Sequence, residues 1–118
     1  MAIARGVAGE RAERLAADYL AARGVTIIER NFRRRCGELD LVARDGETLV
    51  FVEVRLRTRR DFGGAAASIT AAKRARIAAA AGLYLARLGY TPPCRFDAVL
   101  LDALDPGRIE WLKDMMGV

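Results

Sequence analysis

Two alternating stretches of sequence decide the fold: ELDLVAR at residues 38–44 and ETLVFVEVRL at residues 47–56, separated by Asp45-Gly46. Asp-Gly between such stretches is a strong signal for a β-hairpin, because glycine adopts the positive φ that tight turns require. Side chains alternate between the two faces of a strand, so one face of this hairpin is predicted to be apolar throughout and to pack on a helix. That face comprises Leu39, Leu41, Ala43, Val50, Val52, Val54 and Leu56.

The opposite face of the hairpin carries Glu38, Asp40, Glu53 and Arg55 among apolar neighbours. A two-residue turn makes Asp40 and Glu53 diagonal neighbours, and a four-residue loop places them directly opposite each other. Like charges at this spacing destabilise a sheet, so a cation is expected beside them. Two arrangements satisfy this expectation: an ion-pair cluster with Arg55 and a loop arginine, or a divalent metal site.

The rest of the chain predicts an α/β fold in which a mixed sheet carries flanking helices. Helical spacing of apolar residues covers 9–23 and ends at Gly24, and an alanine-rich helix covers 65–88, with a separate start near Ser68 or Thr70. Strands are predicted at residues 25–29, 95–101 and 108–112, and loops at residues 31–35 and 59–64. No linker divides the chain, so a single domain over residues 1–118 is expected.

The composition excludes several classes of site. The chain has no histidine, which removes serine–histidine triads, histidine zinc sites and histidine-based nucleases. Its two cysteines are too few for a four-thiolate zinc site or a disulfide scaffold. The longest apolar run, residues 77–86, is too short to cross a bilayer. A cytoplasmic protein that does not contact membranes is therefore expected.

The positive charge of the chain is concentrated in arginine. Of the 20 basic residues 18 are arginine, and the formal net charge is +5. One cluster comprises Arg30, Arg33, Arg34 and Arg35, and a second comprises Arg55, Arg57, Arg59 and Arg60. High-GC codon usage explains an arginine bias, but two clusters in a small domain indicate a polyanionic partner, since arginine grips phosphate with two donors.

The spacing of the charged residues resembles that of a known group of enzymes. Asp40 followed by Glu53-Val54-Arg55 resembles the PD-(D/E)xK nuclease signature. The series as a whole resembles the YraN-type family of small bacterial proteins. Its further motifs are Gly9-Glu10, Arg30-Asn31, Gly37-Glu38, Phe62-Gly63, Lys73 with Arg76, and Arg95-Phe96-Asp97. The resemblance implies a restriction-endonuclease-like fold with an αβββαβ core.

The resemblance also implies a function and a set of residues. Such proteins are similar to Holliday-junction resolvases, so an endonuclease that hydrolyses phosphodiester bonds in DNA, branched DNA included, is implied, with Mg²⁺ as cofactor and Mn²⁺ as the alternative. Carried onto this chain, the catalytic residues are Glu10, Asp40, Glu53 and Arg55, with Asp40 and Glu53 as metal ligands. The residues expected to bind nucleic acid are Arg33, Arg34, Arg35, Arg57, Arg59 and Lys73.

Arg55 departs from the signature, which has lysine at this position. Arginine keeps the charge but is planar, bulkier and permanently protonated. Either cleavage survives with altered positioning of water, or the protein binds without cutting. Lys73 is expected either to reach the acids from the second helix or to remain on the surface, and Asp97 is expected to pair with an arginine.

Whether the protein is an enzyme therefore stays open at this point. The alternatives are a non-catalytic nucleic-acid-binding module and a protein-interaction subunit. The partner expected is nucleic acid, DNA ahead of RNA, and a homodimer is left open.

Overall fold

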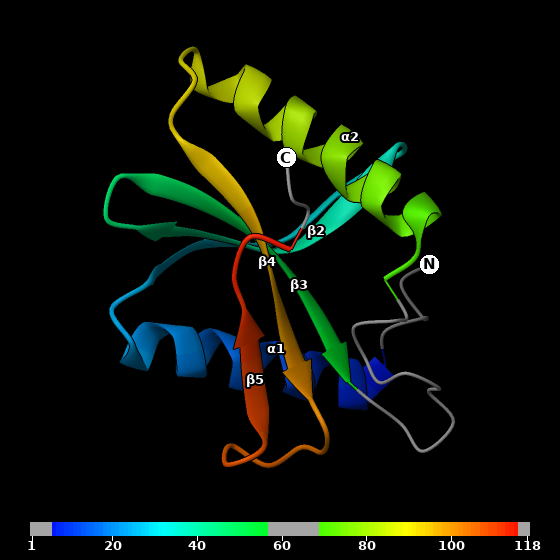
Figure 1. Ribbon diagram of the computed structural model, residues 1–118. Coiled ribbons are helices and arrows are strands. Elements are labelled where there is room, and N and C mark those ends of the chain that lie inside the picture. Colours follow the sequence, from blue (N-terminus) through cyan, green and yellow to red (C-terminus); the bar gives the residue numbers. More distant parts are fainter. Residues whose placement is uncertain (1–5, 57–68, 116–118) are drawn as a thin grey trace.

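The computed structural model describes residues 6–56 and 69–115, which form two helices and five strands (Figure 1). In chain order these are α1 (Gly6–Ala22), β1 (Thr26–Arg34), β2 (Gly37–Asp45), β3 (Thr48–Leu56), α2 (Ala71–Leu88), β4 (Cys94–Leu101) and β5 (Ile109–Leu112). The strands form one sheet in the order β1-β2-β3-β4-β5, in which β3 and β4 are parallel and the other pairs antiparallel. The predicted mixed α/β fold is confirmed, and it is compatible with a restriction-endonuclease-like core.

The central hairpin does not turn at Asp45-Gly46, the two residues that separate its strands in the sequence. Asp45 pairs with Thr48 and Arg44 with Leu49, so Gly46 and Glu47 form the turn. Gly46 has φ 64° and is the first central residue, the position that glycine takes in one of the two favoured hairpin turns. The pairing shifts by two residues, and a shift by an even number keeps the side chains of the paired residues on their predicted faces.

β1 is longer than predicted. Residues 31–34 were expected to form part of a loop, but they continue the strand as far as the pair Arg34 and Gly37. Their polarity is compatible with a strand because β1 lies at an edge of the sheet, where exposed side chains remain in water. Asn31 adopts φ 54°, a conformation that asparagine tolerates better than most residues.

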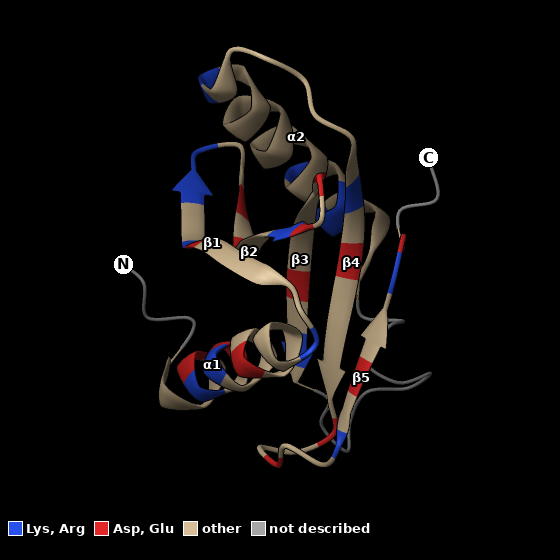
Figure 2. Ribbon diagram, turned by 90° about the vertical axis from the view of Figure 1, so that its left-hand side faces the viewer, with Lys and Arg blue, Asp and Glu red and all other residues tan. Residues whose placement is uncertain are grey.

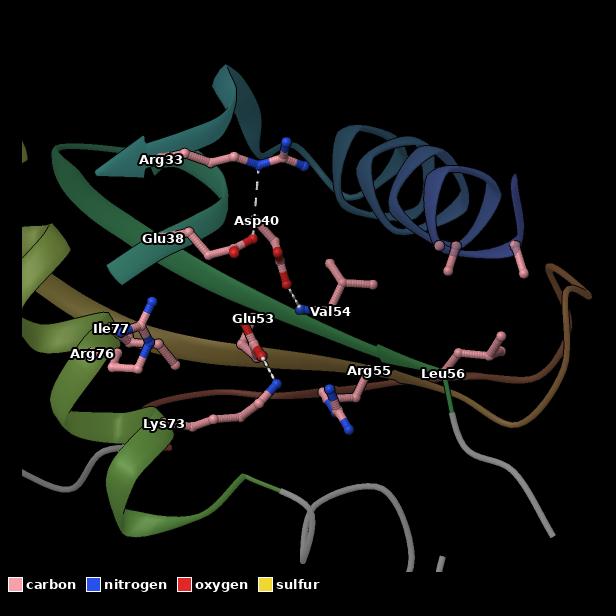
Figure 3. Close-up of a pocket in the computed structure, with 13 residues that line it drawn as sticks. Arg33, Glu38, Asp40, Glu53, Val54, Arg55, Leu56, Lys73, Arg76 and Ile77 are labelled. Carbon is pink, nitrogen blue, oxygen red and sulfur yellow. Dashed lines mark hydrogen bonds and ion pairs between the residues drawn. The ribbon is translucent and has the colours of Figure 1, made fainter. Parts of the chain in front are cut away.

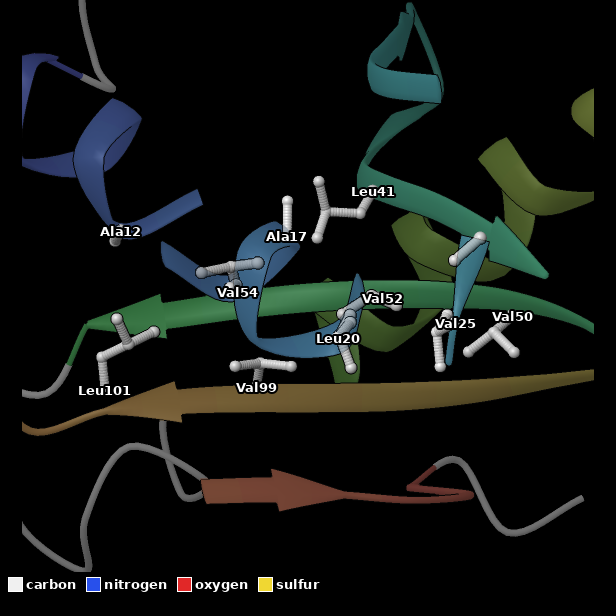
Figure 4. Close-up of a cluster of buried hydrophobic side chains, with 12 residues drawn as sticks. Ala12, Ala17, Leu20, Val25, Leu41, Val50, Val52, Val54, Val99 and Leu101 are labelled. Carbon is white, nitrogen blue, oxygen red and sulfur yellow. The ribbon is translucent and has the colours of Figure 1, made fainter. Parts of the chain in front are cut away.

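Two hydrophobic clusters fix the helices to the sheet. The cluster under α1 contains Leu20, Leu41, Val52 and Val99 (Figure 4). The cluster under α2 contains Phe32, Leu39, Val42, Phe51, Ile77 and Tyr84. Burying each large apolar side chain contributes about 1.5–3 kcal/mol, so these contacts hold both helices in place.

Leu39 is an exception to the predicted faces. It was expected beside Leu41, but it packs in the cluster under α2 together with Phe32. The recorded pairing of β2 with β3 ends at Leu41 and Val52, while pairing of β2 with β1 continues to Gly37. β2 therefore follows β1 away from β3, and the alternation expected from a straight hairpin is lost at this point.

The second helix begins where its polar residues predict. The Thr70 hydroxyl accepts a hydrogen bond from the Lys73 backbone N–H at 3.2 Å and so caps α2. The helix packs closely on the start of β2, because a Cβ atom at Gly37 would overlap the backbone carbonyl of Arg76. Residues 65–68 of the predicted helix and the predicted loop 59–64 lie outside the described residues.

Neither α1 nor α2 is both long enough and apolar enough to span a lipid bilayer.

Candidate functional site

A pocket of about 830 Å³ lies where β2 separates from β3 (Figure 3). It is lined by Ala8, Gly9 and Ala12 of α1, Arg33 of β1, Glu38 and Asp40 of β2, residues 53–56 of β3, and Lys73, Arg76 and Ile77 of α2. Of the lining residues, Val54 packs in the cluster under α1, while Ile77 belongs to the cluster under α2. The pocket thus receives side chains from both sides of the sheet because the two strands diverge.

Asp40 is held at the floor of this pocket by the backbone of β3. Asp40 as a whole is only 3% exposed, and its Oδ2 atom accepts a hydrogen bond from the Val54 backbone N–H at 2.8 Å. The backbone pairing of β2 with β3 ends at Leu41 and Val52, and this hydrogen bond lies just beyond that last pair. The carboxylate therefore takes the place of a strand carbonyl, which fixes its orientation.

Glu53 faces Asp40 from β3, and the two carboxyl groups interact directly. The Glu53 side chain is 11% exposed. Burial, the charge of Asp40 and a hydrogen bond with Asp40 raise the pKa of Glu53 to about 8, although Lys73 acts in the opposite direction. Glu53 therefore carries a proton at neutral pH, because a second negative charge beside Asp40 is unfavourable in this buried position.

Lys73 reaches the acid pair from the first turn of α2. Its Nζ atom lies 3.4 Å from Glu53 Oε2, and its side chain is 41% exposed. Of the two positions expected for Lys73, the structure shows the one beside the acids (Figure 3). Arg76 lines the same pocket and was not predicted, although its spacing of three residues from Lys73 places both on one side of a helix.

The remaining predicted cations are distributed around the pocket. Arg33 and Arg55 line it, and Arg33 Nε lies 3.9 Å from Glu38 Oε2 across the β1–β2 connection. Arg34 and Arg35 are exposed and are not among the lining residues. The predicted nucleic-acid contacts Arg57 and Arg59 lie outside the described residues.

Glu10 is not brought to the acid pair. It lies on the exposed side of α1, whereas its neighbours Gly9 and Ala12 line the pocket. The buried acid of α1 is Glu13, at 3% exposure. The sequence carries a signal for this, since Glu13 stands at helical spacing from the apolar residues Ala16 and Leu20.

Comparison with known proteins places the chain in a family. The family model described as "Uncharacterised protein family UPF0102" matches residues 12–101. The chain belongs to this family. A UPF0102 protein of Nitrosospira multiformis is 50% identical over 110 residues, which cover 93% of this chain and 92% of the relative. A UPF0102 protein of Methylobacillus flagellatus is 53% identical over 106 residues, covering 90% and 93%.

A UPF0102 protein of Ralstonia nicotianae is 54% identical over 115 residues, which cover 93% of this chain and 86% of the relative. UPF0102 is the YraN-type family, so the relationship predicted from the spaced motifs is confirmed.

The donor set of this UPF0102 pocket suits a divalent cation that takes few protein ligands. Among residues 6–56 and 69–115, no group of three or more histidine, cysteine, aspartate or glutamate side chains is arranged to hold a metal ion. Asp40 and Glu53 nevertheless supply two carboxylates, and Mg²⁺ is commonly bound by one or two carboxylates together with water and substrate phosphate. A cation between the acids would relieve the repulsion that contributes to the raised pKa of Glu53, and it would have to displace the proton held there.

Proposed function

We propose that this protein binds nucleic acid and hydrolyses phosphodiester bonds with a divalent cation, Mg²⁺ or Mn²⁺, held by Asp40 and Glu53. The observation that supports this most directly is the acid pair recessed in a pocket with a cationic lining. The acids suit a metal ion, and the four cations around them suit the phosphate of a substrate. These cations are Arg33, Arg55, Lys73 and Arg76.

The chain positions the two acids differently. Asp40 is oriented by the Val54 N–H and is buried, so its carboxylate needs little rearrangement to act as a ligand. Glu53 is oriented by the ammonium of Lys73 and must lose its proton before it can serve as a second ligand. When bound, a divalent cation would polarise the phosphate and lower the pKa of a coordinated water.

The arginines have a separate task in this proposal. Arg55 and Arg76 would bind phosphate oxygens at the wall of the pocket, where a guanidinium provides two parallel donors. Lys73 would remain beside Glu53 and offset negative charge as it develops on the phosphate. DNA is the substrate that we favour, because the fold resembles that of DNA nucleases.

A second candidate function is binding without cleavage. It is favoured by Arg55, which stands where the nuclease signature has lysine, and by the two-carboxylate donor set of the described residues. In this case the pocket would hold a phosphate through its cations and the acids would only limit where the strand can lie.

Cleavage assays on branched, single-stranded and duplex DNA separate these functions. We expect wild-type protein to cut at least one substrate with Mg²⁺ or Mn²⁺ and none with EDTA, and Asp40→Asn to cut at least about a hundredfold more slowly. Asp105→Asn is the matched control, because Asp105 is exposed and Asn keeps the acceptor for the Gly107 N–H. Full activity in Asp40→Asn would assign the cleavage to a contaminant or another site.

Binding in EDTA provides the second measurement. Affinity should decrease steeply as salt concentration rises, because each neutralised phosphate releases counterions. Binding without cleavage of any substrate would establish the second candidate. Neither binding nor cleavage would leave a protein-interaction subunit.

A further inference from the structure

The two helices beside the pocket differ in charge (Figure 2). Over Ala71–Leu88, α2 carries Lys73, Arg74, Arg76 and Arg87, and its sequence contains no aspartate or glutamate. Over Gly6–Ala22, α1 carries Glu10, Glu13 and Asp18 against Arg11 and Arg14. A polyanion that leaves the pocket is therefore attracted toward α2 and gains little on the side of α1.

The arginines of α2 continue the cationic lining of the pocket along one side of the helix. Arg76 lines the pocket, and Arg87 follows eleven residues later, which is about three helical turns and about 16 Å along the axis. A separation of three turns returns the side chain to nearly the same direction. Duplex DNA carries one phosphate per strand for every ~3.4 Å of axis, so this distance spans about five nucleotides.

β1 runs beside this part of α2 and adds a further arginine. Phe32 of β1 packs edge-on against Tyr84 of α2, with ring centroids 5.2 Å apart. The guanidinium carbon of Arg34 lies 4.0 Å from the centre of the Phe32 ring, and that of Arg87 lies 5.3 Å from the same centre. Two guanidinium groups from different elements therefore lie over one buried ring.

Contact with the rings orders both guanidinium groups before any ligand binds. Arg87 also lies 5.2 Å from the Tyr84 ring centre, and Arg34 Nη1 donates to the Arg33 carbonyl at 2.6 Å. A guanidinium stacks through its face and donates hydrogen bonds in its plane, so stacking is compatible with binding a phosphate. The ion pair of Arg87 with Glu29 is 3.8 Å long and half-exposed, and such pairs hold a side chain only weakly.

We propose that nucleic acid bound at the acid pair extends along α2 and the end of β1, and that Arg34 and Arg87 contact its phosphates outside the pocket. We call Arg34, Arg76 and Arg87 the α2 track. The inference rests on the proposed function for the identity of the ligand, and it adds the path that the ligand takes. The side of α1 carries no phosphate contacts in this arrangement.

Salt-dependent binding tests the path with a control on the opposite helix. The double variant Arg34→Met/Arg87→Met removes two charges but keeps side chains that cover Phe32. Arg11→Met/Arg14→Met removes two exposed charges from α1. Fluorescence anisotropy with single-stranded and duplex DNA of about 20 nucleotides, in EDTA to prevent cleavage, gives the slope of log affinity against log salt for each protein.

We expect the slope of Arg34→Met/Arg87→Met to be smaller than that of wild type by about 1.4–1.8, because each lost phosphate contact removes about 0.7–0.9. The slope of Arg11→Met/Arg14→Met should stay within about 0.3 of wild type. If the double variant on the track fails to fold, Arg34→Gln and Arg87→Gln are measured singly, each with an expected loss of about 0.7–0.9.

An unchanged slope in the track variants, or an equal loss in the α1 variant, would overturn the path while leaving nucleic-acid binding intact. Wild-type protein that binds neither DNA at low salt would overturn the proposed function, and the path with it. Vesicles of phosphatidylserine provide the comparison: if the track variant loses vesicle binding but keeps its DNA binding, the arginines form a membrane-binding surface and the path is wrong.

Discussion

Asp97 on β4 and Glu53 on β3 have different surroundings although they lie on neighbouring strands. Asp97 pairs with Val52, and Glu53 pairs with the residue that follows Asp97 in β4. The Asp97 side chain has no exposure and accepts hydrogen bonds from Arg95 Nε at 3.0 and 3.2 Å. It also accepts from Trp111 Nε1 and from the Asp114 backbone N–H, both at 2.9 Å. Glu53 instead faces a second carboxylate and has Lys73 at 3.4 Å.

Asp97 therefore stabilises the fold, whereas Asp40 and Glu53 do not. Asp97 joins β4 to β5 and the residues that follow it, and the predicted pairing of Asp97 with an arginine is confirmed, the arginine being Arg95. Asp40 and Glu53 are brought together against their mutual repulsion, so they cost stability rather than supply it. Arrangements that break a local rule in this way are expected at functional sites.

The largest expected effect concerns the stabilising acid. Asp97→Ala should lower the free energy of unfolding by about 3–5 kcal/mol, because it leaves Arg95 Nε and Trp111 Nε1 without their acceptor in a part-buried position, while Arg95 Nη2 keeps its ion pair with Asp45. Urea denaturation at pH 8 measures this. The comparison variant is Glu53→Gln, which should be as stable as wild type or more so. Equal losses in both variants would contradict the distinction between the two acids.

The next effect concerns activity. Glu53→Gln should reduce Mg²⁺-dependent cleavage by at least about a hundredfold, since it removes a metal ligand worth several kcal/mol of barrier. DNA affinity in EDTA should be unchanged or slightly higher, because a carboxylate beside the phosphate is lost. Glu110→Gln, on the exposed side of β5, is the matched control and should cleave as wild type. Cleavage by Glu53→Gln at the wild-type rate would show that the catalytic assignment is wrong.

A smaller effect is the pH dependence of stability. The pKa of Glu53 is about 8 in the folded protein and 4.5 ordinarily, so between these pH values the folded protein holds a proton that the unfolded chain has released. This stabilisation of the folded protein is complete below pH 4.5 and is lost as the pH rises through about 8. We expect the unfolding free energy of metal-free wild type to fall by about 2 kcal/mol more than that of Glu53→Gln between pH 6 and 8.

Urea denaturation of both proteins across this pH range provides the measurement. Parallel curves for wild type and Glu53→Gln would mean that the folded structure leaves Glu53 ionised, and would remove the contrast with Asp97.

The smallest effect concerns Arg55. Arg55→Lys should raise Mg²⁺-dependent cleavage by about threefold to tenfold and weaken DNA binding slightly, because lysine offers a compact ammonium at the attacking water while arginine offers a fork suited to phosphate. Steady-state cleavage of the preferred DNA substrate measures the change, and Arg74→Lys on the exposed side of α2 is the control. A decrease in cleavage would assign the catalytic cation to arginine itself.

Much of the fold follows from the sequence, because alternation and helical spacing are local properties. The order of helices and strands and the shared face of Asp40 and Glu53 were predicted in this way. The register was left open between two alternatives, because a turn at Asp45-Gly46 and one at Gly46-Glu47 satisfy the same alternation, and the structure has the second. Divergence of β2 from β3, which moves Leu39 across the sheet, depends on tertiary packing and leaves no local signal.

Within the site, the chemical type of the side chains was easier to predict from the sequence than which of them reach the acid pair. The spacing does not decide whether Lys73 reaches the acids or stays on the surface, because a helix residue has the same spacing in both cases. Arg76 was missed, although its spacing of three residues from Lys73 places it on the same side of the helix. Glu10 was predicted from its motif, whereas the apolar spacing of α1 indicates Glu13, which was not considered, as the buried acid.

The contact of Gly37 with Arg76 ties the geometry of the pocket to a residue without a functional group. Because backbone meets backbone there, the distance between β2 and α2 is fixed by the main chain and not by adjustable side chains. Any side chain at position 37 would push the first turns of α2 outward and carry Lys73 and Arg76 away from the acids together. The absence of a side chain at position 37 therefore sets the spacing between the acids and the cations of α2, whereas the exposed side chains of Arg35 and Cys36 in the turn before it do not.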